Sequence, residues 1–307
     1  MMDVGTALAE GRRILAAAGI DTARQDARIL LGALLGIEPS QVALHRERPL
    51  TWSERRAFEE LIRRRAAREP WQYIVGEAEF YSLRLQVTPQ VLIPRPETEL
   101  LVEGLLERVR EVSPVHLADL GTGSGAIAVA LAVARPDAYV EAVDVDEAAL
   151  AVAAANAARW GVLERIAFHQ GSWTRPLLDR GLAGTLHGIA ANPPYVTPEE
   201  YAELEPEVRD YEPPTALLTP VGDPLAPYRD IIQGAAPLLA PGGWLMLECS
   251  PWQAEGVRSL MTARGWQETT IIPDYAGLPR IAAGRRPHGA LAPDPHPGEA
   301  KEPGHGR

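Results

Sequence analysis

The spacing of apolar residues changes along the chain and divides it into regions. Between residues 3 and 70, apolar side chains recur at helical spacing with charged residues between them. Thr51 and Glu54 match a capping box at the start of the helix that contains Phe58. Asp21 is placed to cap the preceding helix, which contains Ile29 and Leu34. We therefore expect a small helical domain over residues 1–70.

A second region, residues 71–95, follows Pro70 and shows the spacing of strands rather than of helices. Its apolar positions are Tyr73, Val75, Phe80, Leu83, Leu85 and Val87. We predict a hairpin here that links the helical domain to the rest of the chain. Pro96 then begins a helix, with Glu97 and Glu99 in its first turn.

From Val115 onward, short apolar runs alternate with helical patterns, an order typical of a parallel sheet covered by helices on both faces. Strands are predicted near residues 115–120, 138–143, 165–169, 186–191 and 243–249. Ligands of such sheets bind at the carboxyl ends of the strands. The last stretch, residues 287–307, is rich in Pro, Gly and His and is predicted to be a disordered tail.

Composition is typical of an intracellular enzyme. The 307 residues are 46% hydrophobic, enough for one large and one smaller domain. The one cysteine, Cys249, excludes an internal disulfide and is predicted to be a buried, inert thiol. The chain starts without a signal pattern and no apolar stretch approaches ~20 residues, so we expect a cytoplasmic protein without membrane contact. No metal is predicted, because His288, His296 and His305 lack compact spacing.

The charge is unevenly distributed. Residues 1–70 carry 12 Lys and Arg against 10 Asp and Glu, a net +2, whereas the remainder carries 18 against 31, a net −13. An acidic surface repels a phosphate backbone, so we expect a basic protein partner rather than direct contact with nucleic acid. The cluster of Arg63, Arg64, Arg65 and Arg68 is interpreted as a solvated helix face.

A glycine turn, residues 119–125 (Asp-Leu-Gly-Thr-Gly-Ser-Gly), lies between a predicted strand and a predicted helix. Its glycines permit positive φ and close approach of a ligand, so we expect a cofactor over the turn. Asp144, about 20 residues on, suits a ribose hydroxyl, and the spacing also satisfies the dinucleotide fingerprint. Asp119 favours an ammonium or sulfonium ligand over a pyrophosphate, and no Gly-Lys-Ser/Thr follows to make a P-loop.

The acceptor motif, Asn192-Pro193-Pro194-Tyr195, follows another predicted strand. Neither proline has an N–H to donate, so the backbone presents carbonyl acceptors beside the Asn192 side-chain oxygen, and Tyr195 offers a ring for stacking. Two acceptors that face one NH2 group position it as a nucleophile. A bare Asn-Pro-Pro is more often a stiff turn, and the glycine turn upstream is what favours a site.

Together these motifs resemble a class I S-adenosylmethionine-dependent methyltransferase, through the glycine turn, Val143-Asp144, Ser172-Trp173 and the acceptor motif. More narrowly, Pro-Arg-Pro-Glu-Thr-Glu at 94–99 and Glu212-Pro213 with Ala216-Leu217 are similar to the HemK/PrmC family. That family methylates the side-chain amide of the glutamine in the Gly-Gly-Gln motif of peptide chain release factors. The resemblance covers about residues 1–285.

The resemblance implies an α/β fold, with a Rossmann-like methyltransferase domain over residues 96–286 and a substrate-recognition domain over residues 1–70. It adds a final antiparallel pair of strands near 269–272 and 280–283. It implies S-adenosylmethionine as cofactor, release factors as substrates and a place in translation termination. A ribosomal-protein glutamine is the near alternative substrate and a nucleic-acid adenine the distant one. A catalytically silent cofactor-binding module would usually lose the acceptor motif.

The residues to which these roles are assigned fall into two sets. The predicted cofactor contacts are Asp119, Gly121, Thr122, Gly123, Ser124, Gly125, Asp144, Trp173 and Asn192. The predicted substrate contacts are Asn192, Pro193, Pro194 and Tyr195, with Asn192, Pro193 and Tyr195 as the catalytic residues. Trp173 is predicted to pack on the adenine, with a plain core tryptophan as the alternative.

The predicted chemistry requires no strong base. The Asn192 side-chain oxygen and the Pro193 carbonyl each accept one N–H of the glutamine amide and stabilise positive charge on its nitrogen. The acidic segment at residues 199–212 is interpreted as a rim that binds substrate. Asp223-Pro224 and Ser250-Pro251 depart from the family pattern and affect the expected local loop geometry.

Overall fold

The N-terminal helices surround a small core of their own. The structure, a computed structural model, describes residues 2–288. Leu15, Leu30 and Phe58 are buried together in this core, and the capping box of Thr51 and Glu54 is confirmed. The helices are α1 (Val4–Ala17), α2 (Ala23–Leu35), the 3-10 helix η1 (Val42–His45), α3 (Trp52–Ala66) and α4 (Trp71–Val75).

Two local predictions in this region are wrong. Asp21 does not cap α2, because the helix begins two residues later, after Thr22, and makes no side-chain cap bond. The predicted hairpin starts later than residue 71, because residues 71–75 form a short helix. Pro70 precedes this helix, and Gly76, at φ 82°, ends it. The hairpin itself is confirmed as β1 (Glu77–Phe80) paired antiparallel with β2 (Leu83–Gln86).

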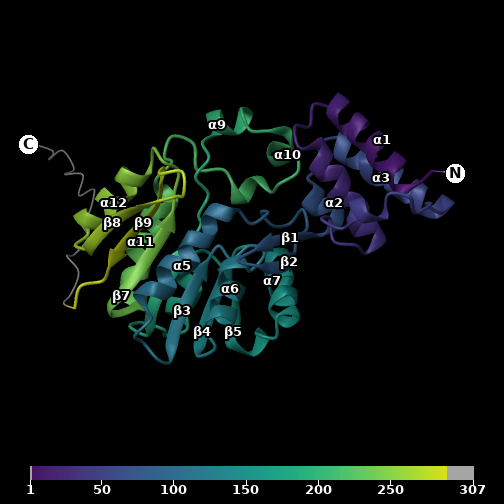
Figure 1. Cartoon of the computed structure of the whole chain (residues 1–307). Helices are drawn as coiled ribbons and strands as arrows, with labels where there is room; N and C mark the ends of the chain where they lie inside the picture. Colours follow the sequence, from purple (N-terminus) through teal and green to yellow (C-terminus); the bar gives the residue numbers. More distant parts are fainter. Residues whose placement is uncertain (1, 289–307) are drawn as a thin grey trace, which may run out of the picture.

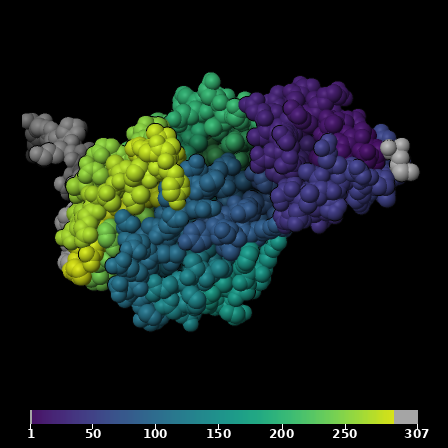
Figure 2. All heavy atoms as spheres, in the orientation of Figure 1, coloured from purple at the N-terminus to yellow at the C-terminus, as the bar shows by residue number. Residues whose placement is uncertain are grey.

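The basic cluster at the end of α3 is only partly solvated. Arg63 is exposed as predicted, but Arg65 is buried, with Nε 2.7 Å from Asp26 Oδ2 and Nη2 2.9 Å from Glu207 Oε1. Arg68 Nη2 lies 2.6 Å from Glu207 Oε2. The prediction fails for these two arginines because the segment after the acceptor motif packs against α3. In Figure 2 its green surface abuts the purple N-terminal helices.

A seven-stranded sheet, in the order β5-β4-β3-β6-β7-β9-β8, organises the rest of the described chain (Figure 1). Its first five strands are parallel, and β9 and β8 are antiparallel at one edge. The predicted strands and the final antiparallel pair are confirmed. Their bounds are β3 (Val115–Leu120), β4 (Ala138–Asp144), β5 (Ile166–Gln170), β6 (Leu186–Ala191), β7 (Leu239–Glu248), β8 (Gln267–Pro273) and β9 (Pro279–Arg285).

Each face of the sheet has its own hydrophobic core. The first core contains Leu101 of α5 and Ile127 of α6, and the second contains Leu177 of α8 and Ile231 of α11. This places helices on both faces, as the α/β prediction requires. The helices are η2 (Pro96–Thr98), α5 (Glu99–Arg108), α6 (Ala126–Ala134), α7 (Glu147–Arg159), η3 (Leu163–Arg165), α8 (Arg175–Asp179), α11 (Ala226–Leu238) and α12 (Ala254–Ala263).

The segment that follows the acceptor motif contains short helices rather than a bare loop. They are α9 (Pro198–Ala202), α10 (Pro206–Arg209) and η4 (Pro214–Ala216). Figure 1 shows α10 beside the N-terminal helices, and the Tyr211 hydroxyl donates to the Ala67 carbonyl at 2.7 Å. The division into domains stays a prediction. Apart from residues 287 and 288, the predicted tail lies outside the described residues, as do His296 and His305.

Candidate functional site

The glycine turn joins β3 to α6 and is held by the neighbouring strand. The N–H groups of Gly121 and Thr122 both donate to the carbonyl of Val143, at 2.8 and 2.9 Å. Gly121, Gly123 and Gly125 have φ values of 75°, 53° and 79°, which side chains rarely adopt. A Cβ on Gly125 would also lie 2.9 Å from the Ala153 Cβ, so the turn and α7 meet closely. The turn therefore needs glycine for both conformation and space.

Asp144 ends β4 beside this turn. Its Oδ2 accepts from the Gly123 N–H at 2.8 Å and its Oδ1 from the Asp146 N–H at 3.0 Å. Burial raises the pKa of the Asp144 carboxyl, and these two N–H groups act in the opposite direction. Each oxygen keeps a lone pair, so the carboxylate can accept further bonds from hydroxyl groups at the cavity.

Asp119 lies beneath the glycine turn, fully buried. Its Oδ2 accepts from the Thr122 hydroxyl at 2.6 Å and from the Ala128 N–H at 3.1 Å, while Oδ1 has no hydrogen-bond partner. Burial raises the pKa of this carboxyl to about 7. Its contacts tie the turn to the first turn of α6. The predicted direct contact with a cofactor stays a prediction, since Asp119 does not line the cavity.

A cavity of about 210 Å³ opens between the glycine turn and the acceptor motif. Trp173, at φ 47°, lies on its wall with the ring against Gly121, and it also packs on the second core. Among the predicted residues, those that line the cavity are Gly121, Thr122, Gly123, Ser124, Asp144, Trp173, Asn192 and Pro194. Asp119, Gly125, Pro193 and Tyr195 are not among the residues that line it. Wall residues that were not predicted include Gln90, Arg95, Thr98, Ile127, Val145 and Thr215.

The acceptor motif follows β6 at the same edge of the sheet. The Asn192 Nδ2 donates to the Thr98 hydroxyl at 3.2 Å, and no hydrogen bond from the described residues reaches its Oδ1. Tyr195 is partly buried and packs on the second core, and its burial raises the pKa of the phenol to about 12. Asn192 is therefore fixed through its nitrogen, with its oxygen available as an acceptor.

Two supports of the site were not predicted from the sequence. Gln253, buried in the turn after β7, donates through Nε2 to the Tyr195 carbonyl at 3.2 Å and to the Pro224 carbonyl at 3.4 Å. Gln253 therefore links the two stretches that depart from the family pattern, Asp223-Pro224 and Ser250-Pro251, to the acceptor motif. Glu212 is buried and binds Arg95 Nη2 at 2.5 Å and the Ile93 N–H at 3.2 Å. The segments at 94–99 and 212–213 both carry the family resemblance, but their contact with each other cannot be predicted from the sequence.

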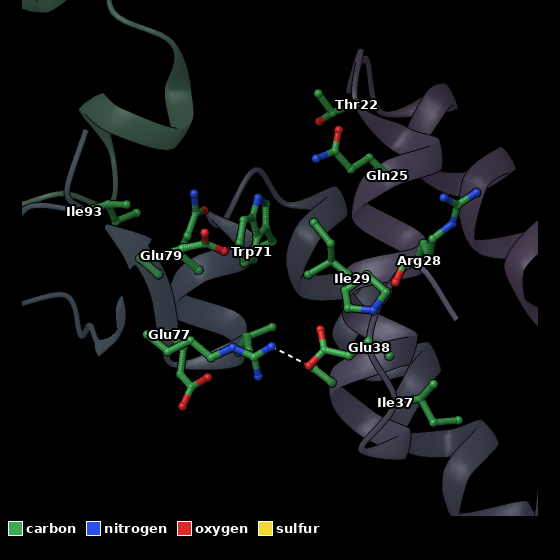
Figure 3. Close-up of a pocket in the computed structure, with 18 of the residues that line it drawn as sticks. Thr22, Gln25, Arg28, Ile29, Ile37, Glu38, Trp71, Glu77, Glu79 and Ile93 are labelled. Carbon is green, nitrogen blue, oxygen red and sulfur yellow. Dashed lines mark hydrogen bonds and ion pairs between the residues drawn. The ribbon is translucent and has the colours of Figure 1, made fainter. Parts of the chain in front are cut away.

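A larger cavity of about 1460 Å³ separates the N-terminal helices from the hairpin (Figure 3). Thr22 and Gln25 of the α2 region face Trp71 and Glu79 across it, and an ion pair between Glu38 and Arg84 bridges one end. Pro94 lines both cavities, so the two cavities are neighbours. No cluster of three or more metal-ligating side chains occurs within residues 2–288, and no helix there is long and apolar enough to cross a membrane.

Comparisons with known proteins match two parts of the chain to family profiles. A profile described as "PrmC N-terminal domain" matches residues 6–76, and one described as "Methyltransferase small domain" matches residues 96–204. Together they span the N-terminal helices, the glycine turn and the acceptor motif.

Curated relatives match over nearly their whole length. A release factor glutamine methyltransferase of Cereibacter sphaeroides is 43% identical over 273 residues, which cover 89% of this chain and 95% of that protein. One of Moorella thermoacetica is 41% identical, covering 91% and 97%. Among solved structures, the hMettl16 catalytic domain in complex with a MAT2A 3'UTR hairpin aligns with TM-score 0.56 at 15% identity, covering 78% of this chain and 85% of that one. That last likeness shows the methyltransferase fold alone.

Proposed function

The chain belongs to the release factor glutamine methyltransferase family, and we propose that it transfers a methyl group from S-adenosylmethionine to the side-chain nitrogen of the glutamine in the Gly-Gly-Gln motif of peptide chain release factors. It would act in the cytoplasm, where translation terminates. The observation that carries the proposal is the placement of Asn192, with its nitrogen held by Thr98 and its oxygen free at the cavity.

The residues of the smaller cavity fit S-adenosylmethionine. When bound, this cofactor supplies an electrophilic methyl group on a sulfonium. Asp144 has lone pairs for ribose hydroxyls, and Ile127, Val145 and Trp173 offer apolar surface for an adenine. A Cβ on Gly123 would meet nothing within 4 Å, so the turn is open on the side from which a ligand approaches.

The acceptor motif would orient the glutamine amide. Asn192 Oδ1 and the Pro193 carbonyl accept its two N–H groups and aim the nitrogen lone pair towards the methyl donor. Both acceptors are partly negative, so they stabilise positive charge that develops on the nitrogen as the new bond forms. Tyr195, fixed by burial and through Gln253, supports this geometry. The methylated amide then loses its proton to water without a dedicated base.

We assign substrate recognition to the N-terminal helices and the larger cavity. Its wall carries both arginines, such as Arg24 and Arg28, and carboxylates, such as Glu77 and Glu79. A folded protein can place a loop through this cavity towards Pro94 and the acceptor motif beyond it. The net −13 outside residues 1–70 disfavours a nucleic-acid substrate.

The test uses cofactor labelled in the methyl group and four separate substrates. They are a release factor, the same factor with its Gly-Gly-Gln glutamine replaced by alanine, a ribosomal protein and DNA. Label is expected in the unaltered release factor alone. Label in the alanine version would mean that the methyl group is attached to another residue of the release factor. Preferential labelling of the ribosomal protein would favour a ribosomal-protein glutamine as the substrate.

A further inference from the structure

Glu248 and Asn192 are neighbours at the carboxyl ends of two strands. Ala191 of β6 pairs in parallel register with Leu247 of β7, so the next residues along, Asn192 and Glu248, continue that register. Two residues earlier, Ala190 and Met246 both face the core that contains α5. Because side chains alternate along a strand, Asn192 and Glu248 also point to that side, where α5 begins.

Thr98, the residue immediately before α5, contacts this pair through Asn192. It occupies the N-cap position, yet its side chain makes no cap bond to the helix. Its hydroxyl instead accepts from Asn192 Nδ2 at 3.2 Å, and the residue is 5% exposed. A threonine at an N-cap usually serves the helix, so this hydroxyl is used for another contact.

Glu248 is a buried acid that the chemistry proposed above does not use. It is 1% exposed, and its Oε2 has no hydrogen-bond partner. Burial raises the pKa of the carboxyl to about 7, and interaction with the Thr98 hydroxyl acts in the opposite direction. Thr98 bonds to Asn192, the register neighbour of Glu248, so the hydroxyl and the carboxyl lie on the same side of the sheet, although no hydrogen bond joins them in this structure. A buried carboxyl with a free oxygen is costly and calls for a role.

We propose that Glu248, acting through Thr98, determines the orientation of the Asn192 side-chain amide. This inference rests on the proposed function of Asn192 as an acceptor. Thr98 and Glu248 are positioning residues, since they do not touch the reacting atoms. Their effect is to present Oδ1, rather than the NH2 group, to the glutamine.

The polarity of the hydrogen bonds determines the orientation of the amide. A hydroxyl can donate one bond and accept others, so Thr98 alone would tolerate either face of the Asn192 amide. An ionised Glu248 can only accept a hydrogen bond, and in the proposed arrangement the Thr98 hydroxyl donates one to it. Thr98 can then only accept from Asn192, which requires Nδ2 on the Thr98 side and leaves Oδ1 facing the cavity. A protonated Glu248 would donate to Thr98, and the preference would reverse.

This arrangement makes methyl transfer depend on the charge of Glu248. The rate should rise as pH rises through the pKa of about 7, because the carboxylate form is the one that orients Asn192. Other charged or titratable groups also face Glu248 and contribute to its titration. They are Arg95, Glu97, Tyr195, Tyr228, Cys249 and Arg280.

The chain offers a direct readout, because its sequence contains two asparagines, Asn156 and Asn192. Selective 15N-asparagine labelling gives two side-chain NH2 signals, and Asn192→Ala assigns them. Asn156 is a built-in control, since its Nδ2 donates to the Gln86 and Ser124 carbonyls. The Asn192 signals should shift with a midpoint near pH 7 and lose that shift in Glu248→Gln, while the Asn156 signals stay in place. An unchanged titration in Glu248→Gln, or none in the unaltered protein, overturns the inference.

Turnover supplies the second readout. Thr98→Val keeps the shape without the hydroxyl and removes no helix cap, and it should lower kcat about 5- to 10-fold, the effect of one hydrogen bond. Thr98→Ser should restore kcat, cofactor affinity should be unchanged in both, and Glu248→Gln should flatten the rise of rate with pH. A Thr98→Val enzyme with normal kcat and pH profile contradicts the inference. If the unaltered enzyme methylates no release factor, the proposed function fails, while the NMR titration still decides the orientation of Asn192.

Discussion

The two halves of the candidate site are built in different ways. The centre of the cofactor side is one continuous stretch, the glycine turn, whose backbone N–H groups donate to the Val143 carbonyl and the Asp144 carboxylate of β4. The acceptor side is assembled from segments far apart in the sequence, with Asn192 held by Thr98 and Tyr195 held through Gln253. A backbone site depends on conformation, whereas a side-chain site depends on which partners surround it. The halves should therefore fail separately, one in binding and the other in turnover.

The largest effect is expected at Asn192. Asn192→Ala removes one acceptor without charging the cavity, so the glutamine amide loses orientation and charge stabilisation. Turnover should fall about 10²–10³-fold. Calorimetry should show near-normal cofactor affinity, and the melting temperature should not change. Normal turnover would exclude the acceptor role, and an unfolded variant would make the motif a structural turn.

The opposite outcome is expected at Asp144. Asp144→Ala removes the carboxylate that would bind the ribose hydroxyls, and S-adenosylmethionine should bind about 10- to 100-fold more weakly. At saturating cofactor the turnover should recover, because the acceptor motif is intact. Unchanged affinity by calorimetry would remove Asp144 from the site, and tighter binding of NAD than of S-adenosylmethionine by the unaltered protein would contradict the cofactor assignment.

A smaller effect concerns the stability of the cofactor half. Burial holds the pKa of Asp119 at about 7, above its value in an unfolded chain, so the folded state keeps a proton that the unfolded state releases from about pH 4 upward. The free energy of unfolding should therefore fall between about pH 4 and pH 7 and then level off. Asp119→Asn should reduce this fall by an amount visible in melting temperatures. An identical pH dependence in both proteins would mean that Asp119 is ionised when folded.

The smallest effect is expected at the acidic rim. Glu205, Glu207 and Glu212 are engaged in internal ion pairs, whereas Glu203 is exposed. Glu203→Lys should slow association with a basic protein substrate a few-fold at low salt and leave cofactor affinity unchanged. Glu164→Lys is the matched control, because it makes the same charge change just before β5. That position is at the amino end of the strand, whereas the candidate site lies at the carboxyl ends. Equal association rates for the two variants would make the rim a solvated surface.

The contrast between the halves also separates what the sequence could predict from what it could not. The alternation of apolar runs located the strands, because a buried parallel strand must be nearly continuous in apolar residues. The glycine turn was visible because positive φ requires glycine in a contiguous stretch. The α/β fold was predicted correctly for these reasons, and the family and enzyme class were predicted correctly from the combined motifs, including 94–99 and 192–195; the relatives confirm them.

The contacts that position the acceptor side were not visible in the sequence. Nothing in the order of residues says that Thr98 accepts from Asn192, or that Gln253 donates to the Tyr195 carbonyl. The same limit explains the error at Arg65, whose partners Asp26 and Glu207 come from distant segments. A charge cluster on one helix resembles a solvated face until the tertiary packing is known. The roles of the site residues themselves stay predictions.

The position of the transferred methyl group decides whether the proposed function is correct. The unaltered enzyme is incubated with cofactor and an equimolar mixture of release factor and ribosomal protein, and both are analysed by tandem mass spectrometry of their peptides. We expect one methyl group on the side-chain nitrogen of the glutamine in the Gly-Gly-Gln motif of the release factor, and its loss with Asn192→Ala. A methyl group on the ribosomal protein instead, or on any release-factor residue other than that glutamine, would contradict the proposed function.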